Sequence, residues 1–294
     1  MCFIGHQLQP SKMINEMENN KMITPVLKWA GGKRQLLETF RPLLPKQIAT
    51  YCEPFIGGGA LFFYLQPNIA FINDINPELI RVYIVIRDNV EELIFELGKF
   101  ENTAEQFYSV RAWDRNKDYY ATLSDTKKAA RVLYLNKTCF NGVYRVNRAG
   151  EFNSPFGNYR NPNIVNAPML RSVSAYLNAA DIHITTTDYA DVLKNVPRGA
   201  FVYLDPPYDP VSKTSSFTGY SRYGFSREDQ IQLRKCCDEL TTRGIKFMLS
   251  NADTKFITEE YEAYNITIVQ AKRTVNAVAS KRGDVNEVVI RNYE

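Results

Sequence analysis

Histidine and paired cysteine are scarce in this chain, and their scarcity excludes several kinds of chemistry. Of the 294 residues, only His6 and His183 are histidines. The first lies in a polar terminal stretch and the second in a strand-like Ile-His-Ile triplet, so we expect neither a histidine-ligated metal centre nor a Ser-His-Asp triad. The five cysteines are odd in number and include no Cys-X-X-Cys pair. They indicate neither a zinc site nor a disulfide framework, and they favour reduced thiols in an intracellular protein.

Long apolar runs and a strong excess of one charge are also missing. No segment approaches the roughly 20 apolar residues that a membrane-spanning helix needs, and the amino terminus lacks the apolar stretch of a signal peptide. We therefore expect a cytoplasmic protein with no membrane partner. The formal net charge is +4, which permits binding to nucleic acid but does not require it. The length suits one large domain, or one domain with a smaller insert.

An α/β pattern occupies both ends of the chain. The first part predicts a strand, a Gly-rich turn, a helix, a second strand and a second helix, at residues 50–54, 55–59, 60–66, 69–74 and 77–87. Beyond residue 181 the pattern resumes, with strands predicted at 182–187, 200–204, 245–250, 264–270 and 286–292 and helices near 226–241 and 254–261. This order predicts a doubly wound, Rossmann-like α/β sheet.

The middle of the chain follows a different pattern. Helical periodicity fills residues 89–138, and residues 140–153 then combine Asn-Gly and Ala-Gly dipeptides with alternating Val, Tyr and Phe. Such a stretch predicts a β-hairpin with exposed arginines. We predict a flexible extension, an α/β domain in two pieces and a mainly helical insert that carries the hairpin, at residues 1–22, 23–88 with 180–294, and 89–179.

The tetrapeptide Asp205-Pro206-Pro207-Tyr208 is the most informative stretch. It follows the apolar run 200–204, which predicts a buried strand, and ligands of open α/β sheets bind beyond the carboxyl ends of the strands. The prolines stiffen the backbone, so the carbonyls of Asp205 and Pro206 can point into a cleft beside the ring of Tyr208. Two acceptors and an aromatic plate suit an amino group on a flat heterocycle such as adenine. A Pro-rich turn without a role is the alternative, and the tetrapeptide alone leaves the two about even.

The turn after the first strand predicts a nucleoside site. Gly57 and Gly59 allow the backbone to approach a ligand closely, and Asp74 ends the next strand, where a carboxylate can accept hydrogen bonds from ribose hydroxyls. The alternative is a tight turn followed by an acidic residue near a helix start. A dinucleotide fingerprint needs a third glycine at position 62, which is Phe62. The pattern therefore disfavours NAD.

S-adenosylmethionine fits the pattern better, because it has no phosphates and carries a sulfonium and an amino-acid carboxylate. Lys33 is the candidate partner of that carboxylate and Asp74 the candidate partner of the ribose. Phe55 and Trp29 are candidates to pack on the adenine or near the sulfonium. Two alternatives stay open: Trp29 can equally pack in the core, and Lys33 can be a solvated cation at a helix start.

Four separated motifs stand together in a fixed order: Lys28-Trp29-Ala30-Gly31-Gly32-Lys33, then Glu53-Pro54-Phe55-Ile56-Gly57-Gly58-Gly59-Ala60-Leu61, then Asn73-Asp74-Ile75-Asn76, and last Asp205-Pro206-Pro207-Tyr208. With these motifs the chain resembles the Dam-type DNA adenine-N6 methyltransferases. The likeness runs from about residue 24 to residue 293. It implies that the methyl group of S-adenosylmethionine is transferred to N6 of adenine in duplex DNA, after the base has been flipped out of the helix.

The resemblance also implies roles for individual residues. Trp29, Lys33, Asp74 and Asp205 are expected to contact the cofactor, and residues 205–208 to carry catalysis. The hairpin looks like the element with which the family reads GATC, so Arg145 is expected to contact a guanine and Phe140 to stack into the duplex. The full set of residues expected at the DNA is Lys28, Phe140, Asn141, Val143, Arg145 and Tyr159.

Two rival functions remain after this comparison. One is an amino methyltransferase that acts on RNA or on cytosine, against which Asp205 and the hairpin argue. The other is a DNA-binding protein that kept the fold and lost catalysis, against which the intact residues 205–208 argue. The sequence leaves open whether a restriction endonuclease acting on the same site accompanies the protein, and it leaves the oligomeric state open.

Overall fold

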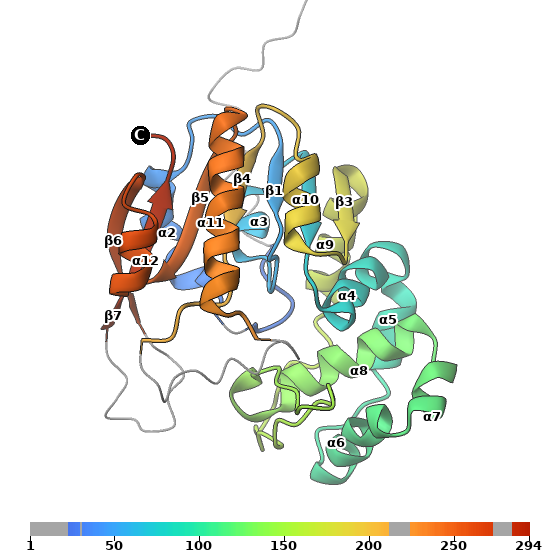
Figure 1. Cartoon of the computed structure of the whole chain (residues 1–294). Coiled ribbons are helices and arrows are strands. Elements are labelled where there is room, and N and C mark those ends of the chain that lie inside the picture. Colours follow the sequence, from blue (N-terminus) through green and yellow to red (C-terminus); the bar gives the residue numbers. More distant parts are fainter. Residues whose placement is uncertain (1–22, 30, 212–223, 273–283) are drawn as a thin grey trace, which may run out of the picture.

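The computed structural model describes residues 23–29, 31–211, 224–272 and 284–294 (Figure 1). The extension predicted at residues 1–22 lies outside this part of the chain. Within it, no helix is long and apolar enough to cross a membrane.

Seven strands of the described chain form one mixed sheet, in the order β3-β2-β1-β4-β5-β7-β6. The strands are β1 (Tyr51–Glu53), β2 (Ile69–Asn73), β3 (Asp181–Thr185), β4 (Phe201–Leu204), β5 (Lys246–Ala252), β6 (Asn265–Lys272) and β7 (Asp284–Arg291). The first five in the spatial order are parallel, while β7 is inserted antiparallel between β5 and β6. The predicted α/β class and Rossmann-like sheet are confirmed.

Both faces of the sheet are buried, which explains the unbroken apolar runs of its central strands. Tyr51, Ile72 and Tyr203 pack into the core on one face, and neighbours such as Cys52 and Val202 pack into the core on the other. The second face is covered by α10 (Tyr189–Asn195), α11 (Arg227–Thr242) and α12 (Lys255–Glu260) (Figure 1). The first is covered by α2 (Leu37–Phe40), α3 (Ala60–Leu65), α4 (Pro77–Asp88) and α9 (Ala167–Ala179).

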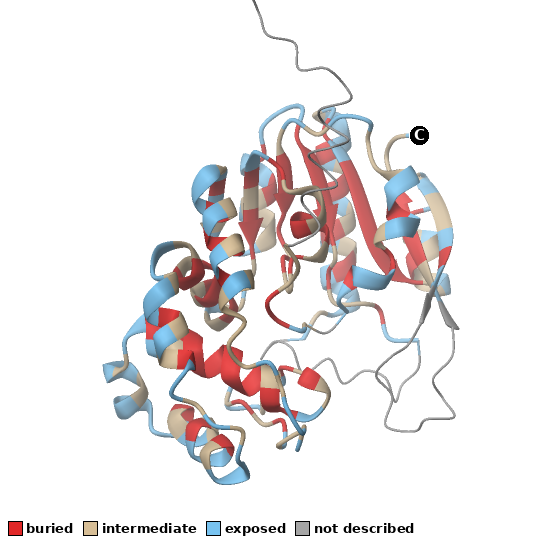
Figure 2. Cartoon of the chain, turned by 180° about the vertical axis from the view of Figure 1, so that it is seen from behind, coloured by how far each residue is buried: buried red, intermediate tan, exposed pale blue. Residues whose placement is uncertain are grey.

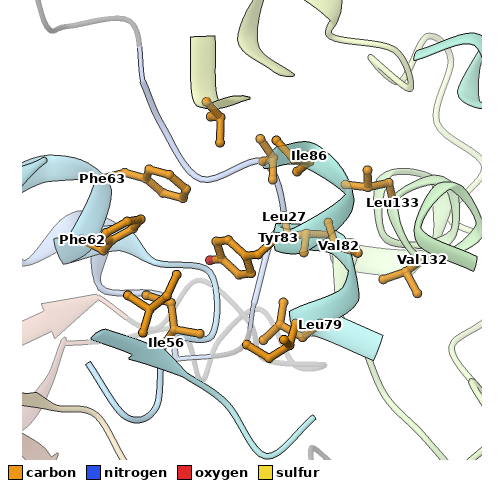
Figure 3. Close-up of a cluster of buried hydrophobic side chains, with 14 of the residues drawn as sticks. Leu27, Ile56, Phe62, Phe63, Leu79, Val82, Tyr83, Ile86, Val132 and Leu133 are labelled. Atoms are coloured by element: carbon orange, nitrogen blue, oxygen red, sulfur yellow. The ribbon is translucent and has the colours of Figure 1, made fainter. Parts of the chain in front are cut away.

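The insert consists mainly of α5 (Val90–Leu97), α6 (Ala104–Arg111), α7 (Lys117–Thr122) and α8 (Asp125–Thr138). Helix α8 is buried along most of its length (Figure 2). Figure 3 shows that α4 joins the insert to the sheet, because Tyr83 points toward Phe62 and Phe63 on α3 while Val132 and Leu133 of α8 approach α4 from the other side. The insert and one face of the sheet therefore share a single hydrophobic core.

The predicted elements agree closely with the structure, with three helices missed and one segment wrong. The sequence did not predict α2, α9 and α10. Residues Phe140–Gly142 form a 3₁₀ turn, η5, and not the first strand of a hairpin. Asn141 and Gly142 have φ angles of 59° and 66°, a left-handed conformation that Asn-Gly adopts readily and that a strand cannot contain. Isolated antiparallel bridges join Cys139 to Phe156 before this turn and Val146 to Phe152 after it.

Because the core is shared, a cavity in α8 should destabilise the whole chain. Leu133 is only 2% exposed, so Leu133→Ala should lower the free energy of unfolding by about 2–5 kcal/mol. Urea denaturation measures the change in the free energy of unfolding for the whole chain. Native-state hydrogen exchange measures the loss of amide protection separately in the sheet and in the insert. Phe95→Ala, on the neighbouring helix α5 at a side chain 65% exposed, is the control. Lost protection confined to the insert amides would contradict a shared core.

Candidate active site

The ends of three parallel strands bring the predicted site residues to one edge of the sheet. Glu53 ends β1, Asp74 follows β2 and Asp205 follows β4. Because β1 lies between β2 and β4 in the sheet, these carboxylates line a continuous edge. Lys33 reaches the same edge from the 3₁₀ turn η2 (Lys33–Gln35), which precedes the first strand.

Lys33 and Asp205 form a buried ion pair at the centre of this edge. The Lys33 Nζ lies 2.8 Å from Asp205 Oδ1 and donates to the carbonyl oxygen of Gly31 at 2.5 Å. The same Nζ lies 4.6 Å from the centroid of the Tyr208 ring, within the range of a cation–π contact. Lys33 is 4% exposed, so the alternative of a solvated cation is wrong.

Burial shapes the protonation of Asp205. It raises the pKa of this carboxyl from 3.8 to about 6, while the ammonium of Lys33 pulls the pKa down and the carboxylate of Glu287 adds to the rise. A second carboxyl, that of Glu53, lies deeper and is only 3% exposed. Burial raises the pKa of Glu53 well above its usual range, although the Tyr51 hydroxyl donates to it at 2.8 Å. Glu53 was not predicted as a site residue, although its position at the end of a buried strand was a signal.

Asp74 holds the Gly-rich turn against the start of α4. Its Oδ2 accepts from the backbone N–H of Gly57 at 3.1 Å, and its Oδ1 accepts from that of Asn76 at 3.0 Å. Burial raises the pKa of Asp74 to about 6, and these two donors partly offset the rise. A Cβ on Gly57 would lie 2.8 Å from Trp29 Cδ1, at a residue whose φ is +47°. The turn therefore requires glycine at this position.

The aromatic candidates lie on two sides of the Gly-rich turn. Trp29 stacks on Tyr144 of the insert, with ring centroids 4.9 Å apart and an interplanar angle of 23°. Phe55 packs instead against Tyr189 on α10, with centroids 5.1 Å apart, and against Phe225 at 6.1 Å. Trp29 thus does pack against protein, as the alternative interpretation held, but it does so beside Gly57 at the edge of the site.

The tetrapeptide is braced from behind by a buried polar relay. Gln230 of α11 donates to the carbonyl oxygen of Pro207 at 2.8 Å and accepts from Asn251 of β5 at 3.0 Å. Asn251 in turn accepts from the backbone N–H of Asp209 at 3.0 Å. The side chain of Asp209 binds Arg227 and Thr254. Sequence reasoning missed this relay, although the polar pair Ser250-Asn251 at the end of an apolar strand was a signal.

The hairpin is anchored to the insert by a buried carboxylate. Asp114 accepts from the backbone N–H of Phe152 at 2.8 Å and pairs with Arg131 at 2.7 Å. Arg115 donates to the carbonyl oxygen of Phe152 at 2.6 Å. On the opposite side, Ser154 donates to the carbonyl oxygen of Val143 at 2.6 Å. The hairpin is therefore held in place on its own scaffold.

The residues expected at the DNA fall into two groups. The exposed group is Phe140, 55% exposed, with Arg145 and Lys28. The Arg145 Nε donates to Asn153 Oδ1 at 2.8 Å across the hairpin. The partly buried group is Asn141, Val143 and Tyr159.

A buried asparagine ties the first motif to the recognition segment. The Oδ1 of Asn136 accepts from the backbone N–H of Lys28 at 2.9 Å, and its Nδ2 donates to the carbonyl oxygens of Lys28 and Gly142 at 2.8 and 3.1 Å. The backbone of Lys28 and the turn at Phe140–Gly142 are therefore linked through one side chain. This residue was also missed, because its partners are distant in sequence.

The site's chemistry is that of a buried acceptor beside an aromatic ring and a cation. Within the described ranges, no three side chains of His, Cys, Asp or Glu are grouped so that they could hold a metal ion. The Gly-rich turn, the carboxylate after β2 and the buried ammonium suit a ligand with hydroxyl groups at one end and an anionic group at the other.

A family model and curated relatives match almost the whole chain. The model of the D12 class N6 adenine-specific DNA methyltransferases matches residues 29–275, and the protein belongs to this family. It is 44% identical to the type II methyltransferase M1.LlaDCHI of Lactococcus lactis subsp. cremoris, over 95% of this chain and 99% of the relative. It is 42% identical to the type II methyltransferase M.MjaIII of Methanocaldococcus jannaschii, over 92% and 99%. It is 32% identical to a DNA adenine methylase of Escherichia coli, over 90% and 93%.

The raised pKa of Asp205 has a consequence for stability. Because the pKa in the fold, about 6, exceeds the ordinary 3.8, the folded protein binds this proton more tightly than the unfolded chain. The carboxyl therefore lowers the free energy of unfolding as the pH rises from about 4 to about 6. The variant Asp205→Asn cannot ionise, so its stability relative to wild type should improve over this range, by no more than about 3 kcal/mol.

Urea unfolding between pH 4 and pH 8 measures this difference. Asp191→Asn, at an exposed carboxylate on α10, controls for the general effect of removing a negative charge. A difference between Asp205→Asn and wild type that stays level across the range would contradict the burial of a charged Asp205.

Proposed function

We propose that this adenine-N6 DNA methyltransferase uses S-adenosylmethionine to methylate adenine within GATC in duplex DNA, on a base flipped out of the helix. The observation that carries the proposal is the position of Asp205 just after β4, where it pairs with the Lys33 ammonium that also lies over the Tyr208 ring. This arrangement combines an acceptor for an amino group with a surface on which a base can stack.

The cofactor fits the first half of the edge. Its sulfonium supplies the methyl group, and this chain supplies the contacts that orient it. Gly57 and Gly59 have positive φ angles and no Cβ, so a ligand can approach the turn closely. Asp74 would accept from the ribose hydroxyls with the lone pairs that Gly57 and Asn76 leave free. Phe55 and Trp29 flank the turn as surfaces for the adenine ring.

Lys33 is the residue with two partners in this proposal. It pairs with Asp205 at 2.8 Å, and it would pair with the carboxylate of the cofactor when that ligand is bound. Transfer of the ammonium to the ligand would free Asp205 to accept from the target base. Without ligand, the ion pair thus holds the Lys33 ammonium and the Asp205 carboxylate together. With cofactor and DNA bound, the ammonium would contact the cofactor and the carboxylate would contact the target base.

Asp205 and the carbonyl of Pro206 would accept from the exocyclic amino group of the target adenine, while Tyr208 stacks on the ring. These acceptors direct the nitrogen lone pair toward the methyl group and stabilise the positive charge that develops on nitrogen during the transfer. Gln230 and Asn251 brace the backbone that carries these acceptors. Such positioning supplies much of the rate, and it needs neither a metal ion nor a histidine base.

The DNA would lie against the insert, with sequence read by the hairpin. The exposed Arg145 can contact the O6 and N7 of a guanine, and the exposed Phe140 can stack into the space that the flipped base leaves. GATC is proposed because residues 140–157 look like the element with which the Dam-type enzymes read that sequence. Two relatives are named type II methyltransferases, which favours a role beside a restriction endonuclease of the same target.

Asp205→Ala tests the catalytic assignment. The variant should lose at least about 3 kcal/mol of transition-state stabilisation, because the main acceptor of the amino group is removed. Transfer of labelled methyl groups to duplex DNA, to single-stranded RNA and to DNA without adenine measures both activity and substrate. Asp191→Ala, on the exposed face of α10, should methylate normally. Near-wild-type transfer by Asp205→Ala would contradict the mechanism. Methylation of RNA by the wild type would show that RNA, and not DNA, is the substrate.

Arg145→Ala tests the reading of sequence. The side chain is exposed, so the variant should fold and bind cofactor normally, and it should lose about 1–3 kcal/mol of discrimination at one guanine position. The measurement is methylation of oligonucleotides with single substitutions in GATC, at several salt concentrations. Arg148→Ala, at the exposed tip of the same hairpin, is the matched control. If Arg145→Ala weakens all sequences alike and lowers the salt slope by about one, the residue grips phosphate instead.

A further inference from the structure

The strand β7 carries a carboxylate, that of Glu287, directly before its buried apolar run. Glu287 precedes Val288, Val289 and Ile290, each of which is fully buried. Because β7 runs antiparallel to β5, its first residues lie at the edge where the parallel strands end, and Glu287 pairs in register with Ala252, the last residue of β5. An ionisable side chain therefore reaches the edge of the active site from a strand that sequence analysis had not connected with it.

Glu287 contacts the aromatic residue of the tetrapeptide directly. The Tyr208 hydroxyl donates to Glu287 Oε2 at 2.8 Å. Burial raises the pKa of Tyr208 well above its usual range, so the phenol remains a proton donor. Glu287 thus acts on Tyr208 through a direct hydrogen bond, in addition to its charge effect on the pKa of Asp205.

The Tyr208 ring is consequently fixed at three points. Lys33 lies over its face, Glu287 holds its hydroxyl, and the N–H of Asp209, the next residue along the backbone, is bound by Asn251. A hydrogen bond to a carboxylate is roughly twice as strong as one between neutral groups. Without it, the side chain could swing about its Cα–Cβ bond and displace the ring while the backbone stayed in place.

We propose that Glu287 is a positioning residue, which holds the hydroxyl end of the Tyr208 ring in place so that the stacked target base presents its amino group to Asp205. This inference rests on the proposed function, because the base is the partner of the ring. Glu287 touches neither the base nor the cofactor in this arrangement. It acts on the rate through Tyr208, since a reacting atom misplaced by about 1 Å can cost roughly 100-fold.

A double-mutant cycle tests the proposal. The variants are Tyr208→Phe, which keeps the ring and loses the donor, Glu287→Ala, which loses the acceptor, and the pair combined. Each single variant should lower the single-turnover rate of methyl transfer by about ten-fold at saturating DNA and cofactor. The double variant should be no slower than either single one, because both remove the same hydrogen bond. Affinity for S-adenosylhomocysteine should stay unchanged in all three.

Two further variants separate positioning from general structure. Glu287→Gln keeps an acceptor for the phenol and should retain most of the rate. Asn286→Ala, one residue earlier in β7, removes an exposed side chain that binds Asp253 at 3.2 Å and should leave the rate unchanged. A loss in Asn286→Ala equal to that in Glu287→Ala would mean that the start of β7 matters only for folding.

The same assay distinguishes a failure of the proposed function from a failure of the positioning role of Glu287. If wild type methylates N6 of adenine and the losses in Tyr208→Phe and Glu287→Ala multiply, the positioning role is overturned and the proposed function stands. If wild type methylates another atom, the proposed function and the role of Glu287 both fall.

Discussion

The buried contact between Lys33 and Asp205 is the interaction around which the active-site edge is organised. An ammonium that is 4% exposed is stable only when it is paired, and removal of either partner would leave the other charge buried alone. Lys33 lies before the first strand and Asp205 follows β4, so the pair also fixes where the segment before the sheet crosses its edge. Gly31, whose carbonyl accepts from the same ammonium, shapes that crossing.

The segment held by this pair also contacts the recognition insert. Trp29 stacks on Tyr144, and Asn136 binds both the backbone of Lys28 and the carbonyl of Gly142. The proposed cofactor site and the proposed DNA-binding insert therefore meet at residues 28, 29 and 31–33. The hairpin needs its own support as well, which Asp114 supplies through Phe152 and Arg131.

The sequence predicted the features that local patterns determine, such as strands and motif residues. It did not predict the residues whose roles depend on partners distant in sequence. The strands were predictable because runs such as 200–204 are apolar throughout, and Lys33, Asp74 and Asp205 were recognisable in motifs that resemble a known family. Gln230 and Glu287 were not, because the sequence does not distinguish them from the other polar residues of α11 and β7. Their partners, Pro207 and Tyr208, lie 23 and 79 residues away.

The Asn-Gly pair at 141–142 illustrates the opposite error. It is a strong local signal for the turn of a hairpin, and both residues do adopt left-handed conformations. They close a 3₁₀ turn instead, because Asn136 and Pro155 bind the backbone there. Periodicity alone could not distinguish these outcomes.

Helix α4 limits how this architecture can be recombined. Its side chains pack on α3 in one direction and face α8 in the other (Figure 3), so a cut at residue 89 would divide a continuous core. An exchange of recognition inserts between relatives should therefore carry α4, from Pro77 onward, and α9, whose Ser174 and Asn178 bind the carbonyl of Arg87 at the end of α4. The transferable module is larger than the part that would touch DNA, and its boundaries follow packing rather than recognition.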